Sequence, residues 1–200
     1  MTDNIDKYNK GNATVKNGAD DQKSDKTDNL ENNIEDNERK MVDVIIPTYR
    51  PAKEFGELLH RLEKQEYRPN RILVMNTGKE YWNSEWENYP LLEVHHLDQK
   101  DFDHGGTRKR AAELSTSDIM VFMTQDALPA DRKMIGNLVR AVSRNSGTGA
   151  AYARQLPKAD CRFLERYTRS FNYPEQSSVK SLPDVETYGI KTYFCSNVCA

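Results

Sequence analysis

The sequence predicts an α/β fold in which helices flank a mostly parallel sheet. Four short apolar runs alternate along the chain with segments that have the apolar spacing of amphipathic helices. Strands that alternate with helices form βαβ units and a parallel sheet. The runs show little polar alternation, which is typical of strands that are buried on both faces.

The first forty residues differ from the rest of the chain. They are rich in Asn, Asp, Lys and Glu, contain a single aromatic residue, Tyr8, and have no periodic apolar pattern. Their 7 basic and 10 acidic residues contrast with 22 and 21 in the remaining 160 residues. Such a polar segment buries too little apolar surface to offset the entropy that is lost on ordering. We therefore expect a disordered tail at residues 1–40 and one folded domain at residues 41–200.

Each expected strand is a run of β-branched and aliphatic residues that a turn-forming residue or a polar segment ends. Pro47 stops the first run, because proline cannot donate a hydrogen bond to a sheet ladder. The turn sequence Asn76-Thr77-Gly78 follows the second run. The four expected strands are residues 42–46, 71–75, 91–97 and 119–123.

Three helices are expected between and after these strands. The first, residues 53–66, has apolar residues at the i, i+3, i+4, i+7 spacing of an amphipathic helix. The second is residues 107–115, with Thr107 at its start, and the third is residues 130–144. The apolar positions that support the first and third helices are Phe55, Leu58, Leu59 and Leu62, and Met134, Ile135, Leu138, Val139 and Val142.

Composition and charge exclude several classes of protein. With 36% hydrophobic residues, 30% charged residues and a net charge of −2, the chain fits a soluble domain and gives no reason to expect nucleic acid as a partner. No apolar run approaches the ~20 residues that span a bilayer, and no secretory signal peptide follows Met1. The odd number of cysteines argues against a disulfide framework, and no His follows Cys195 and Cys199 to complete a zinc site. We therefore expect a cytoplasmic protein without a transmembrane segment.

Asp126 is the most informative polar residue. It ends the segment Thr124-Gln125-Asp126, which places a carboxylate just beyond a predicted buried strand. Ligands of open α/β sheets bind beyond the carboxyl ends of the strands, and Mg²⁺ is typically held by one or two carboxylates plus substrate phosphates. Asp126 is thus a candidate metal ligand. The alternative is that it only caps a helix or starts the turn that Pro129 continues.

Polar residues also follow the first two strands. Thr48 and Tyr49 come directly after Pro47, and Asn76 and Thr77 come after the second strand. Turn chemistry alone explains each segment when it is taken singly. Because the carboxyl ends of parallel strands meet at one edge of the sheet, their convergence with Asp126 favours a ligand crevice.

The segment at residues 101–108 is a glycine-containing loop after the third strand. Gly105 and Gly106 let a backbone approach a ligand closely, and the amides at the start of the next helix attract anions. Arg108 could add a charge-assisted bond to a phosphate. The loop has neither the Rossmann G-x-G-x-x-G spacing nor a Walker A motif. Its alternative interpretation is a helix-capping loop in which His104 is a structural hydrogen-bonding residue.

Together these segments resemble glycosyltransferase family 2, the inverting nucleotide-sugar enzymes with a GT-A fold and its mostly parallel, Rossmann-like sheet. The later segments resemble the rhamnosyltransferase-like branch that acts in bacterial surface-polysaccharide synthesis. The likeness runs from about residue 42 to the end of the sequence. The segments that carry it are residues 44–49, 101–108, 121–127, 154–157, 171–174, 189–192 and 196–197.

The resemblance implies a nucleotide-sugar site and a divalent cofactor, Mg²⁺ or Mn²⁺. Asn76 takes the place of the Asp or Asn that reads the base in many relatives, and Asp126 matches the last Asp of the Asp-x-Asp-type metal motif. Only one carboxylate of that motif remains, so we expect weak metal affinity without bound diphosphate. The implied nucleotide-sugar-binding residues are Pro47, Thr48, Tyr49, Arg50, Asn76, Thr77, His104, Gly105, Gly106, Arg108, Gln125, Asp126, and, on the donor-sugar side, Arg154 and Gln155.

The resemblance also implies substrates. dTDP-rhamnose is the favoured donor, with UDP- and GDP-sugars as alternatives, and the acceptor is a lipid-linked or growing polysaccharide. Such an acceptor makes a peripheral position at the inner face of the membrane the alternative to a freely cytoplasmic one.

One departure from the family concerns the catalytic base. The family places it in an acidic motif, often Glu-Asp, several tens of residues after the metal motif, and no Glu-Asp pair follows Asp126 here. We interpret the chain as a C-terminally truncated domain that binds nucleotide and transfers sugar poorly. The alternatives are a short homologue with a different base, a non-catalytic nucleotide-binding module or an inactive fragment. A nucleotidyltransferase is disfavoured, because no glycine-rich basic loop follows the first strand.

Overall fold

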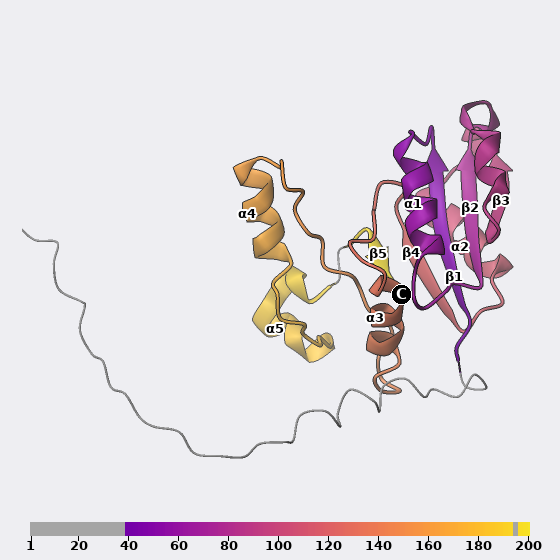
Figure 1. The fold of residues 1–200 in the computed structure, drawn as a ribbon. Coiled ribbons are helices and arrows are strands. Elements are labelled where there is room, and N and C mark those ends of the chain that lie inside the picture. Colours follow the sequence, from indigo (N-terminus) through magenta and orange to yellow (C-terminus); the bar gives the residue numbers. More distant parts are fainter. Residues whose placement is uncertain (1–38, 194–195) are drawn as a thin grey trace, which may run out of the picture. The chain divides into compact units, whose positions relative to one another are not determined.

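A five-stranded sheet in the order β3-β2-β1-β4-β5 organises this computed structural model, which describes residues 39–193 and 196–200 (Figure 1). Strands β1 to β4 pair in parallel, and β5 is antiparallel to β4. The predicted α/β class with a mostly parallel sheet is therefore confirmed. The strands are β1 (Val42–Tyr49), β2 (Arg71–Thr77), β3 (Leu92–Leu97), β4 (Ile119–Met123) and β5 (Val198–Cys199).

The chain divides into Met1–Arg39 and Lys40–Ala200, and everything described below belongs to the second unit. The tail expected at residues 1–40 lies outside the described residues except at its last two positions. The three expected helices are present, each with ends that differ from the prediction, and α4, α5 and β5 were not predicted. The helices are α1 (Glu54–Glu63), α2 (His104–Leu114), α3 (Met134–Val142), α4 (Phe163–Asn172) and α5 (Val185–Tyr188).

Short 3₁₀ segments complete the described structure. Two of them, η2 (Lys79–Tyr81) and η3 (Ser84–Asn88), lie between β2 and β3. The others are η4 (Gln99–Asp101), η5 (Leu182–Asp184) and η6 (Gly189–Thr192). Within the described residues, no helix is both long enough and apolar enough to cross a membrane.

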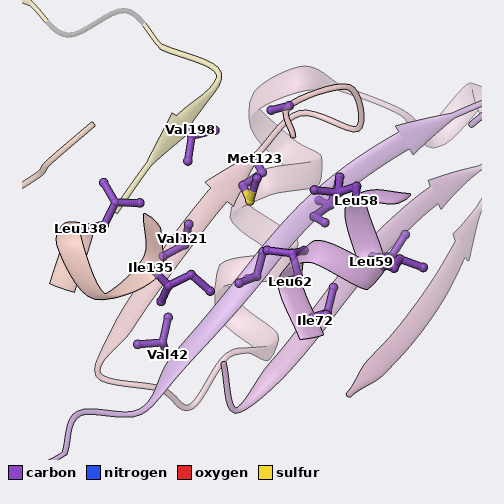
Figure 2. Packing of buried hydrophobic residues seen from close by; sticks show 14 of the residues in the cluster. Val42, Leu58, Leu59, Leu62, Ile72, Val121, Met123, Ile135, Leu138 and Val198 are labelled. Carbon is purple, nitrogen blue, oxygen red and sulfur yellow. The ribbon is translucent and has the colours of Figure 1, made fainter. Parts of the chain in front are cut away.

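Strands β1 and β2 are buried on both faces, as their low polar alternation predicts, whereas most of β3 and part of β4 are half-buried. Figure 2 shows side chains of α1 and α3 in one cluster with side chains of the strands, among them Leu62, Ile135 and Val121. On the opposite face, Ala111 of α2 belongs to a second cluster with Ile45. Neighbouring residues of one strand therefore enter different clusters, which is the period-2 alternation of a β-strand.

Strand β1 continues through Pro47, so the prediction that proline stops it was wrong. The ladder between β1 and β4 ends at the pair Ile45 and Phe122, whereas the ladder between β1 and β2 runs on to Tyr49 and Thr77. A strand tolerates a residue without an N–H where the ladder on one side has already ended. The three residues from Pro47 to Tyr49 thus pair with β2 alone and extend past the last residue pair between β1 and β4.

Helix α3 begins later than predicted because Gln65, two residues after the end of α1, caps its start. The Gln65 Oε1 atom accepts a hydrogen bond from the Ile135 N–H at 3.1 Å, and its Nε2 atom donates to the Asp131 carbonyl at 2.8 Å. Gln65 is buried and so caps α3 from a distant part of the chain. A cap of this kind cannot be seen in the local sequence.

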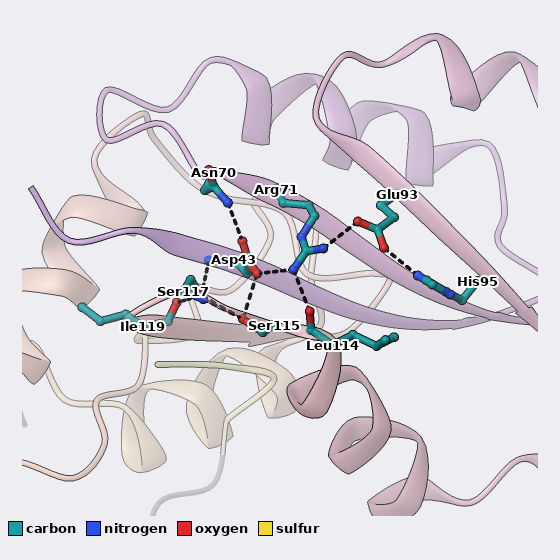
Figure 3. A network of polar contacts seen from close by, with 9 residues as sticks. All are labelled: Asp43, Asn70, Arg71, Glu93, His95, Leu114, Ser115, Ser117 and Ile119. Carbon is teal, nitrogen blue, oxygen red and sulfur yellow. Dashed lines mark hydrogen bonds and ion pairs between the residues drawn. The ribbon is translucent and has the colours of Figure 1, made fainter.

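A polar network lies at the amino-terminal ends of the parallel strands (Figure 3). The buried Asp43 carboxylate accepts hydrogen bonds from Arg71 Nη2 at 2.9 Å, Ser115 Oγ at 2.8 Å and Asn70 Nδ2 at 3.2 Å. Arg71 also bonds Glu93 at 2.7 Å. Burial alone would raise the pKa of Asp43, but the bonds from its partners outweigh burial and hold that pKa below its usual value. The network joins β1, β2 and β3 to the end of α2.

Candidate functional site

Three side chains from the ends of β1, β2 and β3 form a hydrogen-bonded row, in which Thr48 and Asn76 are buried and His96 is half-buried. Asn76 is 0% exposed. Its Oδ1 atom accepts from Thr48 Oγ1 at 2.9 Å, and its Nδ2 atom lies 3.0 Å from His96 Nδ1 and donates to the Gly78 carbonyl at 3.3 Å. The residues are register partners of one another in the sheet. All the hydrogen-bonding capacity that Asn76 shows is therefore directed into the protein.

The row also fixes the charge of His96. Because the Asn76 amide donates to Nδ1, that ring nitrogen must accept, which requires a neutral imidazole. Burial lowers the pKa of His96, and the nearby charge of Lys79 lowers it further. The geometry and the pKa direction agree, so the ring at this strand end is a neutral hydrogen-bond acceptor.

Gln125 joins the end of β4 to the end of β1. Its Oε1 atom accepts from the Tyr49 N–H at 2.9 Å, and its Nε2 atom donates to the Tyr49 carbonyl at 3.1 Å. This amide therefore replaces a strand partner at a position where the β1–β4 ladder has already ended. The clamp brings the residue after Gln125, the exposed Asp126, to the end of β1.

Asp126 is held by its own turn. The Thr124 hydroxyl donates to Asp126 Oδ1 at 2.6 Å, and the Ala127 N–H donates to the Thr124 carbonyl at 3.1 Å. In the described ranges, no group of three or more His, Cys, Asp or Glu residues could hold a metal ion. A single exposed carboxylate beside a hydroxyl suits a hard cation that takes its other ligands from phosphate and water.

Arg50 follows Tyr49 and adopts an unusual backbone conformation. Its φ of 47° lies in the left-handed region, which costs a non-glycine residue roughly 1–2 kcal/mol. Its guanidinium carbon lies 4.3 Å from the ring centre of Tyr81 and 5.1 Å from that of Tyr49, and Nη2 donates to the Tyr81 hydroxyl at 2.7 Å. An exposed cation–π contact stabilises by about 0.5–1 kcal/mol. The contacts to the rings thus roughly offset the backbone strain and leave little net stability.

Tyr81 was not among the predicted site residues. The 3₁₀ turn η2 places its ring beside Tyr49, with ring centres 6.2 Å apart. Gly78 makes this possible, because its φ is 80° and a Cβ there would lie 2.9 Å from the Tyr81 ring. An aromatic residue three positions after a strand-ending glycine is the signal that could have drawn attention to Tyr81.

The remaining predicted residue of the second strand end, Thr77, is buried. Its hydroxyl has no hydrogen-bond partner within the part of the chain that the structure describes. Thr77 is the register partner of Tyr49, so it lies beside the clamped residue.

The loop before α2 is a helix cap in this structure. Helix α2 begins at His104 and not at the predicted Thr107, because Asp103 is its N-cap and accepts a hydrogen bond from the Gly106 N–H. The Asp103 N–H bonds the buried Thr107 hydroxyl at 3.4 Å, and Arg108 Nη1 donates to the His104 carbonyl at 2.8 Å. The Gly106 N–H, one of the helix-start amides that we predicted would attract a phosphate, thus donates to the Asp103 carboxylate in this structure. Phosphate binding by this loop stays a prediction.

Arg154 and Gln155 bond to the segment around α4. Arg154 Nε donates to the Tyr173 carbonyl at 3.1 Å, and Gln155 Oε1 accepts from Arg169 Nη1 at 2.8 Å. The structure therefore brings Pro47, Thr48, Tyr49, Arg50, Asn76, Thr77, Gln125 and Asp126 to one edge of the sheet, whereas the hydrogen bonds of Arg154 and Gln155 connect these two residues to the segment around α4.

A cavity of about 440 Å³ lies between α2, β4 and β5. Arg108, Thr124 and Asn197 contribute polar groups to its mostly apolar lining. Cys199 also lines it, and burial raises the pKa of this thiol. Because Thr124 bonds Asp126, the cavity adjoins the candidate metal ligand.

Comparison with known proteins gives consistent matches. The family described as Glycosyl transferase family 2 matches residues 43–200. The chain is 38% identical over 163 residues to "O-antigen chain rhamnosyltransferase RfbN" of Salmonella typhimurium, which covers 78% of this chain and 50% of that protein. It is 30% identical over 156 residues to "O-antigen chain rhamnosyltransferase WbaN" of Salmonella anatum, with 77% and 49% covered. The chain spans about half the length of the curated relatives it matches.

Two solved structures overlap with part of the chain. One is mannosyltransferase PcManGT from Pyrobaculum calidifontis in complex with GDP-Man and Mn²⁺, at 23% identity and a TM-score of 0.49, covering 58% of this chain and 36% of that one. The other is S. aureus TarS 1-349, at 19% identity and a TM-score of 0.46, covering 60% and 39%.

Proposed function

Because the chain belongs to glycosyl transferase family 2, we propose that it is the nucleotide-sugar-binding part of a rhamnosyltransferase of bacterial surface-polysaccharide synthesis. The names of the two curated relatives support the sugar and the polysaccharide. dTDP-rhamnose is the favoured donor, UDP- and GDP-sugars are the alternatives, and the acceptor is a lipid-linked or growing polysaccharide. We place the reaction in the cytoplasm or at the inner face of the membrane.

The single observation that carries this proposal is the Gln125 clamp. Its two hydrogen bonds to Tyr49 bring Asp126 to the end of β1, where Tyr49 and Arg50 lie. At the carboxyl edge of this parallel sheet, the carboxylate suits the cation of a metal-bound nucleoside diphosphate, the arginine suits its diphosphate, and the aromatic rings suit its planar base. The donor site therefore combines residues that are distant in the sequence.

The proposed reaction is an inverting displacement. An acceptor hydroxyl attacks the anomeric carbon, the bond to the diphosphate breaks, and the nucleoside diphosphate leaves from the opposite face. The chain's own residues hold the leaving group: Arg50 and Arg108 supply positive charge, and Asp126 with Thr124 would hold Mg²⁺ or Mn²⁺. When bound, the cation supplies Lewis-acid stabilisation of the charge that grows on the diphosphate.

The acceptor hydroxyl must also lose a proton to a general base within hydrogen-bond reach. Three carboxylates after Asp126 have local structural partners: Glu165 bonds Arg169, Glu175 bonds Arg154, and Asp184 caps η5 through Ser181. We therefore place the base outside these three residues. Because no Glu-Asp pair follows Asp126 in residues 127–200 either, a second candidate function is a nucleotide-binding module that does not itself transfer sugar.

The test is a calorimetric titration of the chain with dTDP, UDP and GDP, each with and without Mn²⁺. We expect metal-dependent binding of at least one nucleotide and its loss in Asp126→Ala. The matched control is Asp160→Ala, which removes an exposed carboxylate from a turn away from the strand ends. A folded chain that binds none of the three nucleotides, or an Asp126→Ala variant that binds as well as the wild type, would refute the donor site.

Assays with dTDP-rhamnose and a polysaccharide acceptor separate the two candidates. Transfer by the chain itself supports the enzyme. Nucleotide binding without transfer or donor hydrolysis supports the non-catalytic module.

A further inference from the structure

Tyr49, Arg50 and Tyr81 form a cluster at the carboxyl edge of the sheet, and we call its two aromatic residues the tyrosine pair. The two rings are edge to face, at an interplanar angle of 79°, and they are 39% and 40% exposed. The Arg50 guanidinium lies against both rings and is itself exposed. A flat, delocalised cation therefore rests against two half-exposed aromatic surfaces that solvent can reach.

Three features indicate that this arrangement is built by its surroundings and is more than a chance surface contact. Gln125 fixes the Tyr49 backbone from the neighbouring strand, and Gly78, in the left-handed region, clears the space for the Tyr81 ring. Arg50 keeps a strained φ although its ring contacts lie in solvent. Strain that the surrounding structure imposes is typical of ligand-binding segments.

The neighbouring Asn76, which the family resemblance implies as the reader of the base, has no free group with which to bond a base. Its side chain is fully buried and bonds Thr48, Gly78 and His96, so it presents no free hydrogen-bonding group at the surface. Nucleobases also bind by stacking on aromatic side chains and arginine planes, a mode that needs no hydrogen-bond reader. The tyrosine pair provides such a surface at the same strand ends.

We propose that Tyr81 is a nucleobase-binding residue and that the Arg50 guanidinium, in this structure, lies where the base packs against Tyr81 and Tyr49. This inference rests on the proposed nucleotide function and adds a residue to it. When a nucleoside diphosphate binds, the base replaces the guanidinium against the rings. Arg50 is then free to meet the diphosphate, whose negative charge a cation held by Asp126 would also offset.

The test compares ligands with and without a base. The full chain, with Mn²⁺, is titrated with dTDP, UDP and GDP and with inorganic pyrophosphate, which lacks the base. Tyr81→Ala should weaken the best-binding nucleoside diphosphate by about fivefold or more, since stacking on an aromatic residue is typically worth at least that much. It should leave the affinity for pyrophosphate unchanged. Tyr81→Phe keeps the ring and should stay within about twofold of wild type.

The control is Tyr188→Ala, which removes another exposed tyrosine that has a lysine over its ring and lies outside the cluster. It should change neither affinity. Thermal unfolding of each variant confirms that it is folded, and Tyr81→Phe supplies the comparison if Tyr81→Ala does not fold. The outcomes that overturn the inference are an equal loss for both kinds of ligand, no loss for either, or a Tyr81→Phe variant as weak as Tyr81→Ala.

Failure of the broader proposal would look different. If wild type binds neither nucleoside diphosphates nor pyrophosphate, the donor site itself is refuted. If it binds pyrophosphate as tightly as the nucleoside diphosphates, the metal and diphosphate site stands and the base contribution is refuted.

Discussion

At the scale of single residues, the site depends on side chains that substitute for main-chain structure. Gln125 completes a strand pairing that β4 is too short to make, and Asn76 uses its whole amide to join three strand ends. Both residues were predicted as nucleotide ligands. Their positions show why the sequence suggested them. A polar side chain at a strand end can bind a ligand or bond the backbone, and a sequence pattern looks the same in both cases. Only the contacts in the structure distinguish the two roles.

Gln125→Ala tests the clamp. Two hydrogen bonds to an exposed backbone are lost, and water replaces them, so we expect the free energy of unfolding to fall by about 1 kcal/mol. Nucleotide affinity should fall severalfold, because Tyr49 and Asp126 are no longer held together. Urea unfolding and calorimetry measure the two effects. Gln176→Ala, at an exposed position outside the strand ends, is the control, and an unchanged nucleotide affinity in Gln125→Ala would contradict the prediction.

At the scale of elements, the loop after β2 is shaped by one glycine. Gly78 combines a φ of 80° with close contact to the Tyr81 ring, so neither the backbone nor the space admits a side chain. This loop is also where prediction from the sequence stopped. Asn76-Thr77-Gly78 identified a turn, but the path of η2, which returns Tyr81 toward Tyr49, depends on contacts between residues that no local pattern connects.

Gly78→Ala should lower the free energy of unfolding by at least about 1–2 kcal/mol, since alanine carries that penalty in the left-handed region before any clash is counted. It should also displace Tyr81. Gly149→Ala is the matched control: no atom lies within 4 Å of its Cβ position, and its backbone has no positive φ. Urea midpoints measure both variants. Equal midpoints for the two would contradict the structure of this turn.

At the scale of the whole molecule, the four parallel strands followed from the sequence because each is a short continuous apolar run, and the first and third helices followed because each has a regular apolar period. The period of Phe55, Leu58 and Leu62 is an example, since all three are buried in α1. Two of the missed elements differ in their local signals. Strand β5 has only two residues, too few to form a pattern. Helix α4 has Phe163, Tyr167 and Phe171 at the i, i+4, i+8 spacing of one helix face, a signal that the sequence contained and the prediction did not use, although all three side chains are exposed.

A substitution at Asp43 tests how much the polar network at the amino-terminal ends of the strands contributes to stability. Asp43→Asn should lower the free energy of unfolding at pH 7 by about 2–4 kcal/mol, somewhat less than a fully buried ion pair, because Arg71 is partly exposed and keeps Glu93. Glu57→Gln removes an exposed helical ion pair and should have no measurable effect.

The same variant should change how stability depends on pH. The pKa of Asp43 is lower in the folded chain than in the unfolded chain. Its contribution is therefore complete above the unfolded value of ~3.9 and is lost as the pH falls through the lower, folded value. The difference between wild type and Asp43→Asn should shrink below that pH. A constant difference between pH 7 and pH 2 would contradict this account.

The loop between β2 and β3 has an optical consequence. The chain contains two tryptophans, and both Trp82 and Trp86 lie in this loop, with ring centres 5.0 Å apart. Trp82 follows Tyr81 directly, and its ring centre is 5.9 Å from that of His96. All the indole fluorescence of the protein therefore comes from one small region beside the proposed donor site. The emission of the unmodified chain is a built-in reporter of events there, since ligand-driven movement of Tyr81 or protonation of His96 would change the surroundings of the indoles without any attached dye.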